Sequence, residues 1–381
     1  MNFAFDDEVG EFQRQVRAFA AKRLAPHYQT DDRSATFRRA ALKELAGLGL
    51  VGLRIPEEYG GQGASCVAAG VACEEVARAD FNMGYVLNNT ALVGDVLASH
   101  GSAEQCERFL PPIAAGDDLP ALCLTEPEHG SDAASISMRA VEHGSGWRLS
   151  GEKTSITFGM TADTAVVFAR TGGAGARGVS AFYVRLDEDH VTRSEFRDLG
   201  NRAIGRASLH FDDLPLSRDQ LIGEEGGGFI QVMQAFDYAR ALISLICLGA
   251  AQASLDEAFA YARERHAFGQ PIGKFQGVAF PLVEYLTQVR AARLLCYEAL
   301  WRRDRDLPHT AEANMVKWWA PKLAFEAAHQ ALLTHGHPGY SEELPLAQRL
   351  RDIIGLEIGD GTSQIAKLVV ARDILGRPAA P

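Results

Sequence analysis

The stretch FDYARALISLICLGAAQASLDEAFA, residues 236–260, decides the fold of the C-terminal part of this chain. Its residues are apolar or small on nearly every side, so a helix formed by them has no face for water and is expected to be buried among other helices. From Val278 onward, apolar residues recur at alternating steps of four and three, which is typical of the seam of a helical bundle. The sequence therefore predicts a four-helix bundle over residues 229–381.

Two blocks of different composition precede this one. Residues 1–118 read as helical, because apolar side chains recur at helical spacing from Val9 onward. Residues 119–228 hold short apolar or alternating runs separated by Gly, Ser and Asp, which is typical of β-strands joined by tight turns. We therefore predict an α+β chain of three domains: an α-helical domain (1–118), a small β domain (119–228) and the bundle (229–381).

Composition excludes several classes of function. The 381 residues are 47% hydrophobic and 23% charged, as in ordinary globular proteins, and the net charge of −11 argues against binding to nucleic acid. The acidic N-terminus is unlike a secretory signal, and no stretch approaches the roughly 18 uninterrupted apolar residues of a membrane span. We expect a cytoplasmic protein that binds no membrane.

Six cysteines are present, and they form no C-x-x-C pair and no cluster with histidines. In a chain of this length the simplest interpretation is that they are reduced and buried in the core. We expect no metal site.

Two segments of the central block are candidates for a ligand site. In LCLTEPEHGSD (122–132), Gly130 lets the backbone approach a ligand closely, and Ser131 offers donors to an anion or a heterocycle. In the predicted strand GEKTSITFG (151–159), Ile156 and Thr157 are placed to face a planar cofactor. Taken alone, the first segment is an ordinary turn and the second an ordinary strand.

Two further segments carry charges that suit an anionic ligand. Arg240 and Arg265 lie 25 residues apart, which is about seven helical turns, and each suits a phosphate, although a single arginine more often ends a solvated helix. Asp360 precedes Gly-Thr-Ser at a predicted helix start, a place where anions bind. Asp360 by itself is equally well explained as the N-cap of that helix.

In this order and spacing the segments resemble the acyl-CoA dehydrogenase family over essentially the whole chain. The matching motifs are ELAGLGLVGLRIPEEYGGQG (44–63), LTEPEHGSD, FDDLPLSRDQLIGEEGGGF (211–229), ERHAFGQPIGKFQ and DGTSQI. The resemblance implies a helical domain, a small β-barrel domain and a four-helix bundle. It also implies FAD as cofactor, an acyl-CoA substrate, an electron-transferring flavoprotein as electron acceptor and a homotetramer.

The resemblance assigns roles to individual residues. The set that it implies for FAD comprises Leu124, Thr125, Gly130, Ser131, Ile156, Thr157, Arg265, Phe268, Gln276, Thr362, Ser363 and Gln364. The set that it implies for the acyl-CoA comprises Ser131, Asp237, Arg240, Gly361 and Arg372. Within the first set, Arg265, Phe268 and Gln276 are expected to reach the FAD of a neighbouring subunit.

The resemblance implies that a carboxylate removes the α-proton of the thioester while the β-hydrogen leaves as hydride to the flavin. The family usually places a glutamate there, whereas this chain has Asp360. In some members the base comes instead from a helix, and the residue at that position here is Ala239, which cannot act as a base. Glu357 is not at the family position. A base shortened by one methylene is set back by roughly 1 Å, which can cost about a hundredfold in rate unless the substrate compensates.

Three other positions depart from the family pattern. Ser155 replaces the usual tryptophan near the flavin, and Leu333 and His337 replace residues of a Gln-x-x-Gly-Gly run. The first change is expected to enlarge the space near the ring, and the other two are expected to affect one FAD contact. Together with Asp360 they resemble the branch that acts on cyclohexanecarboxyl-CoA and similar cyclic or branched acyl groups.

Two other functions are compatible with the same fold. A flavin oxidase of the nitroalkane oxidase type also uses an aspartate base, but it reduces oxygen and needs no CoA. A flavoprotein without enzymatic activity would tolerate loss of the base. The presence of Asp237 and Arg240 favours the acyl-CoA enzyme over the oxidase, and the acid in a coherent motif disfavours the inactive protein.

Overall fold

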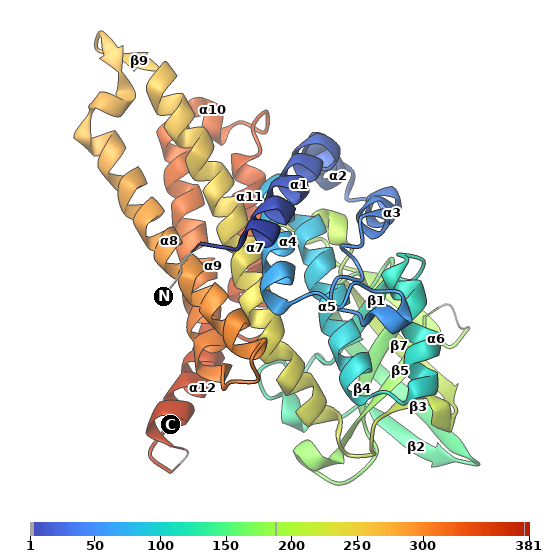
Figure 1. Cartoon of the computed structure of the whole chain (residues 1–381). Coiled ribbons are helices and arrows are strands. Elements are labelled where there is room, and N and C mark those ends of the chain that lie inside the picture. Colours follow the sequence, from blue (N-terminus) through green and yellow to red (C-terminus); the bar gives the residue numbers. More distant parts are fainter. Residues whose placement is uncertain (1–3, 187–188, 377) are drawn as a thin grey trace.

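The computed structural model describes residues 4–186, 189–376 and 378–381. Its N-terminal part is helical, as predicted, and its helices lie against the middle of the molecule (Figure 1). These helices are α1 (Asp7–Arg23), α2 (Tyr28–Ser34), α3 (Arg39–Gly47), α4 (Cys66–Ala79), α5 (Phe81–His100) and α6 (Ala103–Ala114).

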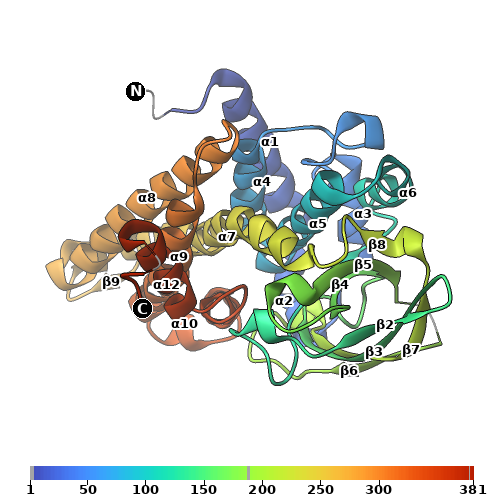
Figure 2. The same ribbon diagram turned by 90° about the horizontal axis from the view of Figure 1, so that it is seen from below.

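A curled sheet follows, with the strand order β6-β7-β3-β2-β4-β5-β8 and with β1 parallel to β4. The strands are β1 (Pro120–Cys123), β2 (Arg139–His143), β3 (Gly146–Ile156), β4 (Thr164–Arg170), β5 (Val179–Arg185), β6 (Val191–Glu195), β7 (Ala207–Leu216) and β8 (Leu221–Ile222). Its two antiparallel halves join where Arg139 pairs with Arg170, and Figure 2 shows them curving toward each other in the manner of a small barrel. This is the predicted β domain.

The C-terminal part is a bundle of long helices built around α7. Its elements are α7 (Gly228–Glu264), β9 (His266–Ala267), β10 (Gln270–Pro271), α8 (Gln276–Arg303), α9 (Thr310–His335), α10 (His337–Tyr340), α11 (Leu346–Ile354) and α12 (Ser363–Leu375). Helices α8 and α9 pack on α7 and on each other, and α12 packs on α9. The predicted four-helix bundle is confirmed.

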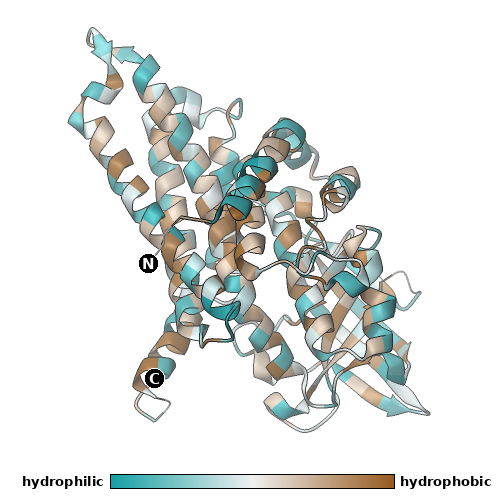
Figure 3. Ribbon diagram, viewed as in Figure 1, coloured by the Kyte–Doolittle hydropathy of each residue, from teal (hydrophilic) through white to brown (hydrophobic). Residues whose placement is uncertain are grey.

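Helix α7 is the buried helix that its composition predicts. Figure 3 shows apolar residues along its length, and residues such as Leu242 and Ile246 are fully buried. By length and composition alone this helix could cross a membrane, but 94% of its most apolar window is buried inside the protein, as in the core helix of a globular fold.

The bundle also packs against the N-terminal helices, because α7 contacts α4 and α5. Two glycines permit the close approach. A Cβ at Gly249 of α7 would lie 2.4 Å from the carbonyl oxygen of Glu74, and a Cβ at Gly70 of α4 would lie 2.4 Å from a methyl group of Leu300. The helical blocks therefore share one continuous core.

Helix α6 ends at Ala114, the strands run from Pro120 to Ile222, and α7 begins at Gly228. The division into domains after residues 118 and 228 stays a prediction about folding units. All six cysteines are free and buried, as predicted. Within the described residues, no group of three or more His, Cys, Asp or Glu side chains could hold a metal ion.

Two acids are buried where the N-terminal helices meet α11. Asp80 caps α5 by accepting hydrogen bonds from the N–H groups of Asn82 and Met83, and burial raises its pKa to about 7. Asp352 accepts hydrogen bonds from the Tyr28 hydroxyl at 2.7 Å and the Asn201 N–H at 2.6 Å, and burial raises its pKa to about 6. Burial therefore shifts both carboxyl groups toward the protonated form in the folded chain.

This burial predicts a specific pH dependence for Asp80. The pKa of Asp80 is higher in the folded chain than the ordinary value of 3.8, so between about pH 4 and pH 7 the folded state binds more protons and stability falls as pH rises. In Asp80→Asn the cap acceptor is kept and the charge is lost. We expect its thermal unfolding midpoint to rise by several degrees relative to the wild type between pH 5 and pH 8, measured by differential scanning fluorimetry.

Asp6→Asn serves as the control, because Asp6 caps α1 in the same way but is exposed. Its midpoint relative to the wild type should be the same at both pH values. A constant difference between Asp80→Asn and the wild type at the two pH values would contradict the predicted linkage.

Candidate active site

Asp360 lies in the turn between the short helix η8 (Gly355–Glu357) and α12. Its φ is +55°, in the left-handed region that aspartate tolerates better than most residues, and Gly361 follows with φ +101°. Thr362, not Asp360, caps α12, because its side chain accepts a hydrogen bond from the N–H of Ile365. The alternative that Asp360 is merely the helix cap is therefore wrong, and its half-buried carboxylate is available for another purpose.

The carboxylate of Asp360 meets a tyrosine of a distant helix. The Tyr85 hydroxyl on α5 donates a hydrogen bond to Asp360 Oδ2 at 2.9 Å. Burial raises the pKa of Tyr85 well above its ordinary value, the charge of Asp360 raises it further, and a hydrogen bond with the Thr157 side chain works in the opposite direction. One hydroxyl thus lies beside both the candidate base and Thr157, the residue directly after β3 that is expected to face the flavin.

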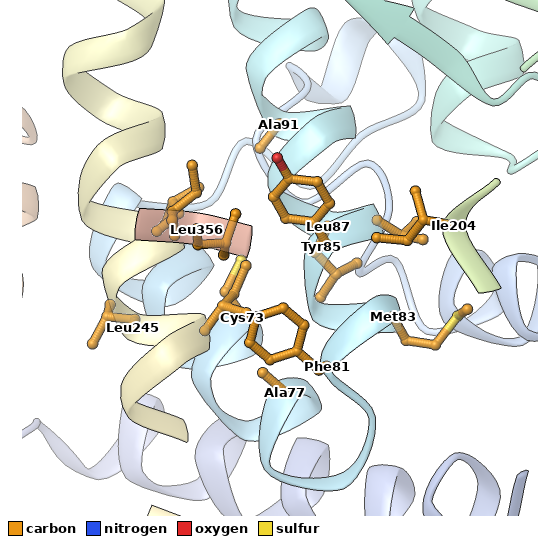
Figure 4. Packing of buried hydrophobic residues seen from close by; sticks show 14 of the residues in the cluster. Cys73, Ala77, Phe81, Met83, Tyr85, Leu87, Ala91, Ile204, Leu245 and Leu356 are labelled. Carbon is orange, nitrogen blue, oxygen red and sulfur yellow. The ribbon is translucent and has the colours of Figure 1, made fainter. Parts of the chain in front are cut away.

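Sequence reasoning did not find Tyr85. The only local signal is a hydroxyl-bearing ring in a helix that is buried over most of its length, and a buried tyrosine hydroxyl usually has a partner. Nothing in the sequence of α5 says that this partner is Asp360, 275 residues further along. Figure 4 shows Tyr85 among buried side chains, between Leu356 of η8 and Ile204.

A buried lysine binds the backbone of the turn that carries Asp360, which we call the base turn (residues 358–362). Lys317 of α9 donates hydrogen bonds to the carbonyl oxygens of Leu356 and Gly361, both at 2.8 Å. Burial lowers the pKa of Lys317 to about 8, and the charge of Asp360 partly opposes this shift. Since these two carbonyl groups flank Asp360, Lys317 fixes the backbone on which the carboxylate is carried. This lysine was also missed from the sequence.

Arg240 contacts the same turn from α7. Its Nη1 donates to Asp237 Oδ1 at 2.9 Å, and its Nε lies 3.5 Å from the carbonyl oxygen of Asp360. The Thr310 hydroxyl donates to the other oxygen of Asp237 at 2.7 Å. Burial lowers the pKa of Arg240, and Asp237 and Asp360 work in the opposite direction. The structure thus brings Asp237, Arg240 and Gly361, three residues of the predicted acyl-CoA set, next to the predicted base Asp360.

The loop expected to contact the flavin is fixed by a buried ion pair. Lys153 Nζ donates to Glu126 Oε1 at 2.7 Å and to the carbonyl oxygen of Leu124 at 2.9 Å. Glu126 also accepts hydrogen bonds from the Ser137 hydroxyl and the Ser137 N–H. Burial works to raise the pKa of Glu126, but Lys153 and these donors hold it below its ordinary value. Neither Lys153 nor Glu126 was identified from the sequence.

The surface of this loop fits a flavin nucleotide. Gly130 and Ser131 are exposed, and a Cβ at Gly130 would meet no atom within 4 Å, so backbone and hydroxyl are open to a ligand. Thr125, on the same loop, and Thr157, directly after β3, are half-buried. Ile156 is only 2% exposed and Leu124 only 5%. A donor set of hydroxyls and open backbone suits a pyrophosphate and a polar ring edge.

Ser155, in place of the family tryptophan, is exposed and has φ +57° within a β-bulge of β3.

Three residues of the predicted FAD set lie far from the others. Arg265 ends α7, Phe268 is 96% exposed in the β9–β10 hairpin, and Gln276 begins α8. Figure 1 shows this hairpin at the end of the bundle remote from the sheet. Along α7, Arg265 is roughly 37 Å from Arg240 at about 1.5 Å per residue. The structure does not bring them to the FAD loop of the same chain, and Leu333 and His337 are likewise exposed.

The remaining predicted residues lie on α12. Thr362 caps the helix, Ser363 is half-buried and Gln364 is exposed, so the helix start presents polar groups. Arg372 is exposed more than two turns later, and its Nε donates to the carbonyl oxygen of Pro381 at 3.3 Å. The structure does not place Arg372 next to Gly361, and its role toward CoA stays a prediction.

Glu357 is the other acid near the base turn. It is half-buried, and burial raises its pKa. The charges that act on it are those of Lys322, Glu326 and Lys317, all of which belong to α9. The short helix η8 that carries Glu357 packs on α9, whereas the carboxylate of Asp360 accepts a hydrogen bond from Tyr85.

Comparison with known proteins agrees with this geometry. Three family models match the chain: the acyl-CoA dehydrogenase N-terminal domain over residues 6–117, the middle domain over 121–214 and the C-terminal domain over 226–375. The mouse mitochondrial short-chain specific acyl-CoA dehydrogenase is 38% identical over 97% of this chain and 90% of its own length.

Solved structures give the same result. Butyryl-CoA dehydrogenase from Megasphaera elsdenii superposes with a TM-score of 0.95 at 31% identity, covering 98% of this chain and 100% of its own. A chain of the structure described as the electron transferring flavoprotein of Acidaminococcus fermentans has a TM-score of 0.95 at 32% identity, again covering 98% and 100%. The chain therefore belongs to the acyl-CoA dehydrogenase family, and it is an oxidoreductase that uses FAD and acts on an acyl-CoA.

Proposed function

We propose that this enzyme removes hydrogen from Cα and Cβ of a short branched or cyclic acyl-CoA, with Asp360 as the base that takes the α-proton. The observation that carries the proposal is the position of the Asp360 carboxylate. It is half-buried, accepts a hydrogen bond from the Tyr85 hydroxyl beside Thr157, and lies on a turn that Arg240 contacts. A substrate held between the end of β3 and this turn would have its α-carbon next to this acid.

FAD, when bound, supplies the acceptor for the β-hydrogen, which leaves as hydride. The chain supplies the base and its alignment. Within the described part of the chain, the N–H groups of Asp360 and Gly361 donate no hydrogen bond, so they are free to bind the thioester carbonyl oxygen and stabilise the charge that develops there. Lys317 keeps these N–H groups in place by binding the carbonyl groups on either side of Asp360.

The substrate preference follows from the reach of the base. Aspartate sets its carboxylate back by one methylene, and a ring or an α-branch occupies the room that this leaves beside Cα. The relatives named above are described as short-chain and butyryl-CoA enzymes, which supports a small acyl group. The branch or ring is the part of the proposal that depends on Asp360.

The first test is Asp360→Asn, which keeps the shape of the side chain and removes the base. Flavin reduction, followed anaerobically by bleaching of the flavin absorbance, should fall by at least about a thousandfold, as for loss of an acid–base group. Binding of FAD and of the acyl-CoA should be unchanged. Glu357→Gln is the matched control, and its flavin should be reduced at nearly the wild-type rate because Glu357 lies on η8, which packs on α9.

The same assay compares substrates. Cyclohexanecarboxyl-CoA or a 2-methyl-branched acyl-CoA should reduce the wild-type flavin faster than butyryl-CoA, and Asp360→Glu should shift the preference toward butyryl-CoA. Faster reduction of the wild-type flavin by butyryl-CoA than by the cyclic or branched acyl-CoA would contradict the proposed substrate preference. Near-normal turnover by Asp360→Asn together with loss in Glu357→Gln would assign the base to Glu357.

We further propose a homotetramer in which Arg265 serves the FAD of a neighbouring subunit. Arg265, Phe268 and Gln276 are exposed at the tip of the bundle, too far along α7 to reach the FAD loop of their own chain. Large apolar side chains are exposed on the same helical block: Phe280, Val283, Leu294, Trp301, Leu333 and Tyr340. Such a face is typical of a surface covered by another subunit.

Arg265→Lys should lose FAD on gel filtration, because lysine lacks the paired donors that bind a pyrophosphate. FAD content per chain, read from absorbance, and molar mass by light scattering measure the effect together. Arg263→Lys is the control, since Arg263 is exposed two residues before Arg265, in the last turn of α7, and this variant should retain FAD. A monomer that keeps FAD tightly would contradict the tetramer and the role of Arg265.

We propose a cytoplasmic enzyme that passes its electrons to an electron-transferring flavoprotein. The free cysteines suit a reducing compartment, and an acyl-CoA site that excludes water should also keep oxygen from the reduced flavin. With substrate present, peroxide formation should be far slower than reduction of an electron-transferring flavoprotein. Peroxide produced at the rate of substrate turnover would support an oxidase of the nitroalkane oxidase type.

A further inference from the structure

We propose that Tyr85 is a positioning residue for the base: its hydroxyl holds one carboxylate oxygen of Asp360 so that the other oxygen faces the substrate α-carbon. This inference rests on the proposed function. It concerns a residue on α5, in the N-terminal helical block, whereas Asp360 belongs to the turn before α12.

The first step of the argument is the division of the two carboxylate oxygens. The Tyr85 hydroxyl donates to Oδ2 at 2.9 Å. Within the described residues, no other donor is hydrogen-bonded to the carboxylate of Asp360, so Oδ1 is free. Proton transfer needs one acceptor oxygen close to the carbon acid and correctly aligned. Binding Oδ2 selects Oδ1 for that purpose.

The second step is the rigidity of the backbone on which Asp360 stands. Lys317 binds the carbonyl groups of Leu356 and Gly361, and Arg240 lies against the carbonyl group of Asp360 itself. These contacts fix the turn but leave the side-chain torsions of Asp360 free. The hydrogen bond from Tyr85 is the contact that restricts those torsions.

The third step is the fixed position of Tyr85. The residue is 9% exposed on a helix whose neighbouring residues Val86 and Leu87 are buried in the core. The Thr157 side chain lies beside the same hydroxyl. The hydroxyl therefore joins parts of all three sequence blocks at one point, namely α5, the end of β3 and the base turn. A short acid at this position depends on such an anchor more than a longer one would, because it cannot reach the substrate by changing its own conformation.

The experiment uses the FAD-loaded enzyme and Tyr85→Phe, which keeps the ring and removes the hydroxyl. Without the anchor the carboxylate samples unproductive orientations, so the rate constant for flavin reduction should fall about 10- to 100-fold, the effect of misplacing a reacting group by about 1 Å. The Kd for the acyl-CoA should change by less than about threefold, and FAD content should stay the same. The α-deuterium isotope effect on reduction should increase, because proton abstraction has become slower.

A second readout does not depend on hydride transfer. With the flavin reduced beforehand, hydride transfer is blocked, and exchange of the substrate α-hydrogen in D2O reports proton abstraction alone. Mass spectrometry of the recovered acyl-CoA should show slower exchange for Tyr85→Phe, in proportion to its slower reduction. Exchange by Asp360→Asn should be absent.

Tyr28→Phe is the matched control. Tyr28 is also buried, and its hydroxyl also donates to an aspartate, Asp352, at 2.7 Å, but this pair lies outside the site. Its loss should lower the thermal unfolding midpoint and leave reduction and exchange rates unchanged.

Three outcomes decide the inference. Slower reduction and exchange in Tyr85→Phe, with normal binding and a normal Tyr28→Phe enzyme, support it. Rates within about threefold of wild type, or a loss of acyl-CoA and FAD binding that accounts for the slower rate, overturn it. A wild type that neither reduces its flavin nor exchanges the α-hydrogen with any acyl-CoA would overturn the proposed function, and this inference with it.

Discussion

The burial of α7 is the constraint on which the rest of this structure depends. The helix is apolar or small on nearly every side, so it is stable only when other helices cover it completely. Helices α8 and α9 cover one part, and α4 and α5 cover another. The N-terminal helices and the C-terminal bundle are thereby packed on the same core, although more than a hundred residues of sheet separate them in the chain.

That arrangement determines where polar groups can be placed. The interior between α5, α7 and α9 admits charged side chains only where they are paired or hydrogen-bonded. Arg240 is paired with Asp237, and Lys317 donates hydrogen bonds to two carbonyl groups. Both contacts meet at the turn that carries Asp360. A buried polar network of this kind makes the turn rigid, because loss of any one partner would leave an unsatisfied buried group.

The candidate site is thus a meeting point of the three blocks rather than a property of any one of them. The central block supplies Thr157 at the end of β3 and an open loop around Gly130, held by the ion pair of Lys153 and Glu126. The C-terminal block supplies the acid and its backbone. The N-terminal block supplies Tyr85, which contacts both. Acid–base chemistry on a thioester requires this convergence. The acid, the N–H groups that donate to the thioester carbonyl oxygen and the cofactor must all lie around the same part of the substrate.

The sequence by itself determined whether each of the three blocks is helical or built of strands. The spacing of apolar residues differs between helices and strands and can be read within a short stretch of sequence. The sequence also pointed to the acid that we propose as the base, since Asp360 stands in a motif with Gly361 and Thr362 that resembles a known family. Only the tertiary structure decided what surrounds that acid. Tyr85 and Lys317 lie 275 and 43 residues from Asp360, and neither occurs in a motif of its own. Their hydrogen bonds arise from the packing of α5 and α9 around α7, which no local pattern encodes.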